Sequence, residues 1–137
     1  MPSPALPRDR RRAHFWIVLP AILLILADTA LTLPFQPSSY WTGSYENYEG
    51  ISPLGAAILR IHPAAFAAFV LAWIAAVLLI VGVARGPWNR EVGLAVVVGH
   101  SAGIYGWLDE RSYWSTIPVF IAVGALTVLC WRQAEIR

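Results

Sequence analysis

The chain has 137 residues, of which 58% are hydrophobic and only 13% are charged, so its composition excludes an ordinary soluble domain. Its formal net charge of +2 comes from ten basic residues, all of them arginine, against eight acidic ones. The single cysteine, Cys130, excludes an internal disulfide and a zinc site built from several cysteines. The length allows one domain.

Four apolar segments are long or nearly long enough to cross a hydrocarbon core about 30 Å thick, which takes about 17 to 25 helical residues. They cover residues 13–33, 64–84, 92–108 and 113–131. We therefore predict an all-α membrane protein, an up-and-down bundle of four transmembrane helices. The remaining residues are predicted to form a disordered tail, an outer loop and a second tail, at 1–12, 34–60 and 132–137.

The placement of the arginines predicts the orientation of the bundle. Eight of them flank the four spans on one side, and only Arg60 and Arg111 fall on the other. By the positive-inside rule, both tails are predicted to lie in the cytoplasm and the protein in an inner membrane. Six tryptophans agree, because they form a belt at each predicted boundary of the lipid bilayer: Trp16, Trp88 and Trp131 inside, Trp41, Trp107 and Trp114 outside. No basic surface is then left over for nucleic acid.

The outer loop and the turns carry helix and turn signals. Ser52-Pro53 followed by LGAAIL predicts a short helix with proline at its first position, and His62-Pro63 opens the second span. The connections at 85–90 and 109–112 are short, so the second, third and fourth helices are predicted to be neighbours.

His100 stands near the middle of the third predicted span, beside a stripe of small residues. Gly99, Gly103 and Gly106 share one face of that helix and favour close helix packing, either within the chain or against partner membrane helices, including those of a second copy. Because an imidazole in lipid is costly, His100 is predicted to face the bundle. It either makes a structural contact between helices or acts as a ligand or proton carrier.

Asp28 is the acidic residue within the first predicted span, with Thr32 one turn beyond it. An ionised aspartate in hydrocarbon costs about 2.5 to 3.5 kcal/mol, so it needs a partner or a proton. At about 1.5 Å per residue, Asp28 lies about 9 Å below Pro34, and His100 lies about 13 Å below Asp109. A direct contact between them is therefore predicted to need a tilted helix or an intervening side chain.

Glu49, in the outer loop, extends this candidate site. If the loop folds over the outer mouth of the bundle, Asp28, Glu49 and His100 come together as two carboxylates and one imidazole, a ligand set suited to a divalent metal such as zinc, manganese or iron. The other interpretation is a solvated acidic outer surface.

The segment from Gly99 to Gly103 also matches the G-x-S-x-G pattern of the α/β-hydrolase nucleophile, with Ser101 at its centre. That motif needs a strand turning into a helix and a histidine further along the chain. No histidine follows Ser101, so we interpret it as a helix-packing residue.

Several short motifs together resemble a family of uncharacterised small four-helix bacterial membrane proteins. They are Asp28-Thr29 with Leu31-Thr32, Tyr40-Trp41 with Gly43 and Tyr45, Glu49-x-x-Ser52-Pro53-Leu54, and Gly99-His100-x-x-Gly103-x-x-x-Trp107. The family pattern has Glu-x-Asn-Pro in the loop, where this chain has Gly50-Ile51-Ser52 before the proline. The resemblance implies a polar site on the outer side made of Asp28, Glu49 and His100, and no particular activity.

Three functions follow from these observations. The first is a polar, metal-binding site near the outer leaflet, with Asp28, Glu49 and His100 as catalytic and ligand residues, that hydrolyses a membrane substrate through activated water. The second is a non-enzymatic accessory or scaffold subunit of a membrane complex, in which Asp28 and His100 fix the helix register. The third is a small transporter or proton path.

Overall fold

The computed structural model describes residues 7–50, 52–83, 88–109 and 113–135, and these residues form helices and no strand. Four helices are long: α1 (Pro7–Thr32), α4 (Pro63–Val83), α5 (Trp88–Asp109) and α6 (Tyr113–Glu135). Between α1 and α4 lie three short ones: α2 (Ser38–Trp41), the 3-10 helix η1 (Tyr45–Asn47) and α3 (Pro53–Leu59). The prediction of an all-α fold is confirmed.

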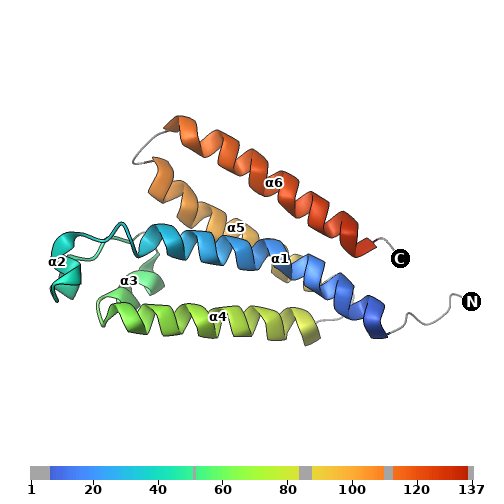
Figure 1. Ribbon diagram of the computed structural model, residues 1–137, viewed down its shortest axis with the longest axis horizontal. Coiled ribbons are helices and arrows are strands. Elements are labelled where there is room, and N and C mark those ends of the chain that lie inside the picture. Colours follow the sequence, from blue (N-terminus) through green and yellow to red (C-terminus); the bar gives the residue numbers. More distant parts are fainter. Residues whose placement is uncertain (1–6, 51, 84–87, 110–112, 136–137) are drawn as a thin grey trace, which may run out of the picture.

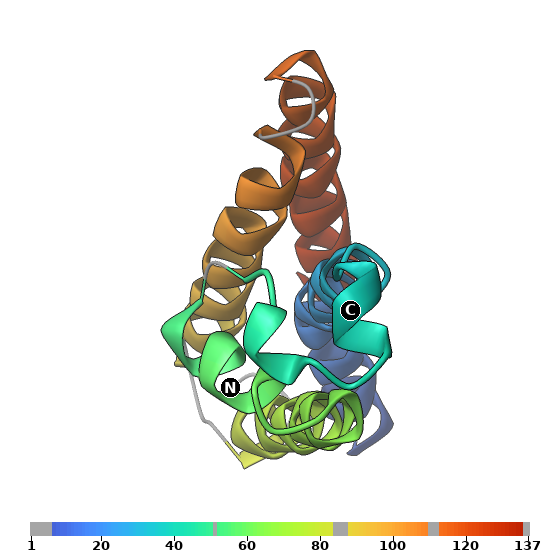
Figure 2. The same ribbon diagram turned by 90° about the vertical axis from the view of Figure 1, so that its left-hand side faces the viewer.

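Helix α1 lies at the centre of the arrangement and packs against α4, α5 and α6, while α5 also contacts α4 and α6. Figure 1 shows that α1 begins and α6 ends at the same end of the molecule, with the short helices at the opposite end. Seen from that opposite end, α2 and α3 lie in front of the long helices (Figure 2). One end of the bundle therefore carries the start of α1 and the end of α6, and the other end is covered by the loop.

Within the part of the chain that the structure describes, three helices are long and apolar enough to cross a membrane: Ala13–Thr32, Pro63–Val83 and Thr116–Glu135. Only 11% of the apolar stretch of α6 is buried, and large side chains such as Ile121 and Leu129 are exposed. So much exposed apolar surface is typical of a membrane protein. Helix α5 is not among the three, because His100 and several glycines lower its hydropathy, so the count of four spans stays a prediction.

The helix boundaries differ from the predicted ones at three places. Helix α1 begins at Pro7, so residues 7–12, which were predicted to be disordered, are helical. Proline is favoured at the first position of a helix, and arginine is a good helix former, which explains this extension. Helix α5 begins at Trp88 and α6 continues to Glu135, beyond the predicted spans. Residues 1–6 of the predicted tail, and most of the two predicted turns, lie outside the described residues.

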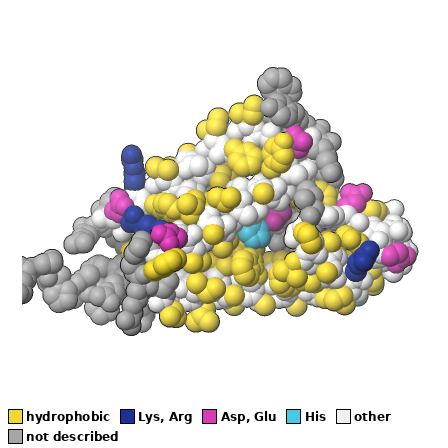
Figure 3. All heavy atoms as spheres, turned by 180° about the vertical axis from the view of Figure 1, so that it is seen from behind, with side chains coloured by type: hydrophobic (Ala, Val, Ile, Leu, Met, Phe, Trp, Pro, Cys, Tyr) yellow, Lys and Arg dark blue, Asp and Glu magenta, His cyan; other side chains and the backbone are white. Residues whose placement is uncertain are grey.

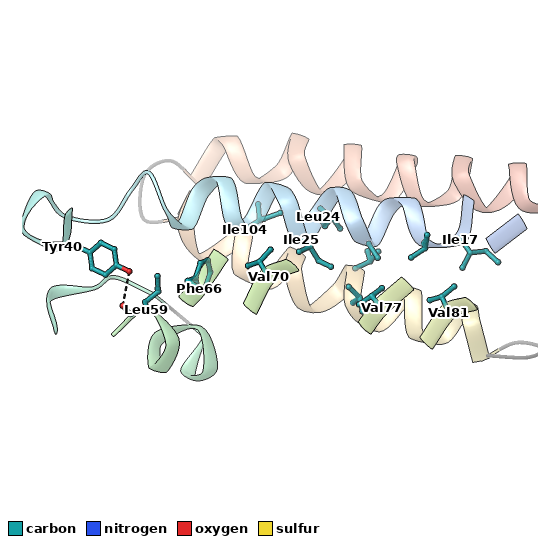
Figure 4. Close-up of a cluster of buried hydrophobic side chains, with 14 residues drawn as sticks. Ile17, Leu24, Ile25, Tyr40, Leu59, Phe66, Val70, Val77, Val81 and Ile104 are labelled. Atoms are coloured by element: carbon teal, nitrogen blue, oxygen red, sulfur yellow. Dashed lines mark hydrogen bonds between the residues drawn. The ribbon is translucent and has the colours of Figure 1, made fainter. Parts of the chain in front are cut away.

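The hydrophobic core runs along α1 where α4 and α5 meet it. Figure 4 shows its side chains, contributed chiefly by α1, α4 and α5: Ile17, Leu24, Ile25, Phe66, Val70, Val77, Val81 and Ile104. Toward the loop end, the core continues to Tyr40 of α2 and Leu59 of α3, and the Tyr40 hydroxyl donates to the Leu59 carbonyl at 3.1 Å. The loop is thus fixed to the bundle by apolar contacts and by a buried hydrogen bond.

The two predicted helix starts near the loop are confirmed. The Ser52 hydroxyl accepts a hydrogen bond from Gly55 N–H at 3.3 Å, and Pro53 is the first residue of α3. His62 directly precedes Pro63, the first residue of α4, and its Nδ1 accepts a hydrogen bond from the Ala64 N–H at 3.0 Å. Both side chains satisfy backbone donors that a helix start leaves without an intrahelical partner.

Candidate binding and acid–base site

Asp28 of α1 and His100 of α5 are in direct contact. Oδ2 of Asp28 lies 2.8 Å from Nδ1 of His100, and each side chain is 22% exposed. The sequence predicted that such a contact needs a tilt or an intermediate group. Figure 1 shows α5 crossing α1 obliquely, and no intervening side chain is required. Both groups are half-buried between the helices, where each satisfies a polar atom of the other.

Trp73 of α4 completes a chain of three polar groups. Its Nε1–H donates to Nε2 of His100 at 3.1 Å. Because an indole N–H can only donate, Nε2 must carry a lone pair and Nδ1 must carry the proton that is donated to Asp28. His100 is therefore a neutral imidazole whose orientation and tautomer are set by two side chains from two other helices.

Trp73 is not among the site residues that the sequence predicted, although one signal was present. Of the seven tryptophans, it is the one that was assigned to neither aromatic belt. It stands in the middle of an otherwise aliphatic and small-residue stretch of α4. A tryptophan at that depth needs a partner for its N–H.

Two glycines allow α5 to come close to α1. A Cβ added at Gly93 would meet the Ile17 carbonyl oxygen at 3.4 Å, and a Cβ at Gly103 would meet both carboxylate oxygens of Asp28 at 2.8 Å. Gly103 therefore leaves the space that the Asp28 carboxylate occupies. Part of the predicted glycine stripe packs within the chain, and its use toward partner membrane helices or a second copy stays a prediction.

A cavity of about 640 Å³ opens beside the Asp28–His100 pair. Its walls come from α1, α4 and α5, and Gly50 of the loop together with residues 52–56 at the start of α3 covers one side. Most lining residues are apolar, including Phe66, Phe69 and Val70 of α4. Among the described residues, Asp28 is the only acidic group in the lining and no arginine contributes to it. A volume of this size, lined by apolar groups with a few converging polar ones, is typical of a small-molecule site.

Figure 3 shows the face of the molecule opposite to that in Figure 1. Hydrophobic side chains cover most of its middle, and charged side chains lie mainly toward the two ends. A histidine and an acidic side chain are visible next to each other within this apolar middle.

A second set of hydrogen bonds fixes the loop against the cavity. Gln36 is 5% exposed, and its amide makes a pair of hydrogen bonds with the backbone of Glu49: Nε2 donates to the Glu49 carbonyl at 2.7 Å, and Oε1 accepts the Glu49 N–H at 2.8 Å. Nε2 also donates to the Thr32 carbonyl at 2.8 Å. The Thr32 hydroxyl accepts from Trp107 Nε1 at 3.1 Å. Gln36 thereby holds the segment that leads into the cavity lining at Gly50.

Glu49 does not join Asp28 and His100 in this arrangement. Its backbone is held by Gln36, and the residue is exposed. Across the described residues, no three histidine, cysteine, aspartate or glutamate side chains lie close enough together to hold a metal ion. Both ring nitrogens of His100 also have partners already, so the residues present do not form a ready set of metal ligands. A divalent metal at Asp28, Glu49 and His100 remains a prediction.

Ser101, the centre of the G-x-S-x-G match, is buried within α5. It follows a helical residue rather than a strand, which agrees with its interpretation as a packing residue. Comparison of the chain with protein-family models, with curated proteins and with solved structures gave no match. The interpretation of the site therefore depends on its own geometry.

Proposed function

We propose that this chain is a four-span protein of the bacterial inner membrane that binds an amphipathic, membrane-soluble molecule in the cavity beside Asp28 and His100. The observation that carries the proposal is the combination of a largely apolar cavity of about 640 Å³ with one fixed polar chain, Asp28–His100–Trp73. The apolar walls match the body of such a molecule, and Nε2 of His100 is the acceptor for its polar end.

The proposal includes α5 as the fourth span. Helix α5 has 22 residues, which is about 33 Å at 1.5 Å per residue, and it packs against α1, α4 and α6. Its polar residue His100 is paired inside the bundle, so its low hydropathy is compatible with a membrane helix. Arg90 and Arg132 lie at the end where α1 begins, which supports placing that end in the cytoplasm.

The test is photolabelling of the purified protein in lipid nanodiscs with a long-chain alcohol that carries a diazirine. Label is expected in the residues of α4 and α5 that line the cavity, and unlabelled alcohol is expected to compete for it. Gly99→Leu is the blocking variant, because Gly99 lines the cavity and has open space where a side chain would begin. Gly124→Leu on α6 is the matched control, since it also has open space but lies outside the cavity lining. Labelling that is equal in both variants and resists competition would refute binding in the cavity.

A second candidate function, hydrolysis of a membrane substrate, is favoured by the orientation of His100. With Nδ1–H bound to Asp28, Nε2 is the basic nitrogen, the arrangement found in general-base catalysis. A water molecule at Nε2 would give its proton to the imidazole as its oxygen attacks an ester carbonyl, and the imidazolium would return that proton to the leaving alcohol. Asp28→Asn is expected to lower hydrolysis of long-chain p-nitrophenyl esters by about 10²-fold or more while photolabelling persists. Equal turnover in both proteins would remove this candidate.

A further inference from the structure

The Nε2 atom of His100 is a hydrogen-bond acceptor at the edge of an apolar cavity. Its present partner is the Nε1–H of Trp73, at 3.1 Å. Trp73 itself is 36% exposed, and its ring lines the cavity. The hydrogen bond between Trp73 and His100 is thus part of the cavity wall, at a place where a bound molecule would meet it.

Only certain polar groups fit between Trp73 and His100. The group must accept the indole N–H and, at the same time, donate a proton to Nε2, because the tautomer of His100 is fixed from its other side by Asp28. A hydroxyl does both. An ether or a carbonyl oxygen only accepts, so it would leave Nε2 without a donor, which is costly in an apolar surrounding.

The charges around the cavity restrict the polar group further. Among the described residues that line it, no arginine is present, and Asp28 supplies the only carboxylate. A phosphate or carboxylate head would therefore be buried without a cation and next to an acid, which is unfavourable. An ammonium head would find Asp28 already bound to His100 Nδ1–H.

From these constraints we propose that the ligand is an uncharged lipid-like alcohol or phenol, whose hydroxyl inserts between Trp73 Nε1 and His100 Nε2. The inference deepens the proposed function and depends on it, since it names the chemical class that the cavity takes. The hydroxyl accepts from Trp73 and donates to His100, while the apolar chain lies along Phe66, Phe69 and Val70.

The test compares ligands that share one chain and differ only in the polar end. Hexadecanol, its methyl ether, hexadecanoate, hexadecyl phosphate and hexadecylamine would each compete with the photoreactive alcohol on the protein in nanodiscs. Hexadecanol is expected to bind about three- to tenfold more tightly than the ether, which lacks only the donor, and at least about tenfold more tightly than the three charged compounds. If any charged compound or the ether binds as tightly as hexadecanol, the inference is wrong, although binding in the cavity would stand. If no compound competes, the proposed function itself fails.

Two variants identify which side chain distinguishes the hydroxyl from the ether. His100→Phe is expected to abolish the preference for alcohol over ether, whereas Trp73→Phe is expected to keep it, because both ligands lose the same donor. The reverse result would assign the recognition to Trp73 and overturn the inference. A measurement on the unmodified protein supplements the variants. The ¹⁵N signal of His100 Nε2 is expected to shift on addition of hexadecanol, because its donor changes from N–H to O–H, and to shift to a different value with the ether, which leaves Nε2 without a donor. An unchanged signal at saturating alcohol would count against the insertion.

Discussion

Gly103→Ala tests whether the space at Gly103 is what positions Asp28. A methyl group there would lie 2.8 Å from both Asp28 carboxylate oxygens and 3.0 Å from the carboxylate carbon. Rotating the carboxylate about its own axis offers no escape, because the two oxygens are equally close. The whole group must therefore move by about 0.6 Å to reach the 3.4 Å at which ordinary contact begins.

That movement acts on the bond to His100. His100 and Gly103 belong to the same helix, so a carboxylate pushed away from α5 also moves away from the imidazole. The present distance of 2.8 Å would lengthen toward the weak limit of a hydrogen bond. Loss of a buried hydrogen bond costs about 1 to 3 kcal/mol, against a gain of about 1 kcal/mol when alanine replaces a helical glycine. We expect net destabilisation of about 1 to 2 kcal/mol or a neutral result, with a weakened Asp28–His100 bond in either case.

The matched control is Gly99→Ala, one turn earlier on α5. No atom lies within 4 Å of a Cβ built there, so only the gain in helix propensity of about 1 kcal/mol remains. Thermal unfolding in nanodiscs compares the stabilities of the two variants, and the ¹⁵N–¹H signal of His100 Nδ1 reports on the hydrogen bond. If Gly103→Ala matches Gly99→Ala in stability and leaves the His100 signal unchanged, the steric argument is wrong.

Three further predictions concern the loop and the helix ends. Gln36→Leu removes both hydrogen bonds to the Glu49 backbone, so it is expected to lower the free energy of unfolding by about 1 to 3 kcal/mol and to speed amide exchange at Glu49. The control Glu49→Gln keeps those bonds and should change neither quantity. Equal exchange rates in the two variants would contradict this. Burial, and then the neighbouring Tyr45, raise the pKa of Tyr40 above its usual 10.0. The stability that comes from keeping Tyr40 protonated is therefore complete below about pH 10 and is lost as the pH rises through the raised pKa. The free energy of unfolding of Tyr40→Phe should thus fall less steeply with pH in alkali than that of the unmodified protein. Parallel pH profiles for the two proteins would refute this. Glu135→Gln breaks the exposed 2.8 Å ion pair with Arg90 and should cost less than about 1 kcal/mol, an effect that added salt removes; a larger, salt-independent loss would disagree.

The sequence predicted those features that depend on local pattern. Apolar runs of the length of a membrane helix predicted the all-α class, and the Ser52-Pro53 signal predicted the start of α3, because both follow from neighbouring residues. The placement of His100 toward the bundle, and the need of Asp28 for a partner or a proton, followed from the cost of leaving either group in lipid. These are single-residue arguments, and they require no knowledge of how the helices cross.

Features that depend on how separate helices meet were not predictable in the same way. Trp73 and His100 are 27 residues apart in the chain, and Gln36 and Glu49 are 13 apart, so neither pairing leaves a local pattern. Glu49 was predicted to act through its carboxylate, yet the residue is exposed and it is its backbone that Gln36 binds. Gln36, which forms these hydrogen bonds, carries no charge and was not among the predicted site residues.

The structure also changes what the polar groups can do. The predicted set of two carboxylates and one imidazole would leave ligand atoms available for a metal ion. The structure instead links Asp28, His100 and Trp73 in a closed chain, in which both ring nitrogens of His100 have partners. A closed chain fixes the tautomer, and a bound group reaches Nε2 of His100 by entering between Trp73 and His100. A group that enters there must both accept and donate a hydrogen bond. It must also be uncharged, because the lining residues that the structure describes include no arginine. Selectivity at this site would thus come from Nε2 of His100, whose role as an acceptor Asp28 fixes from the other side of the ring.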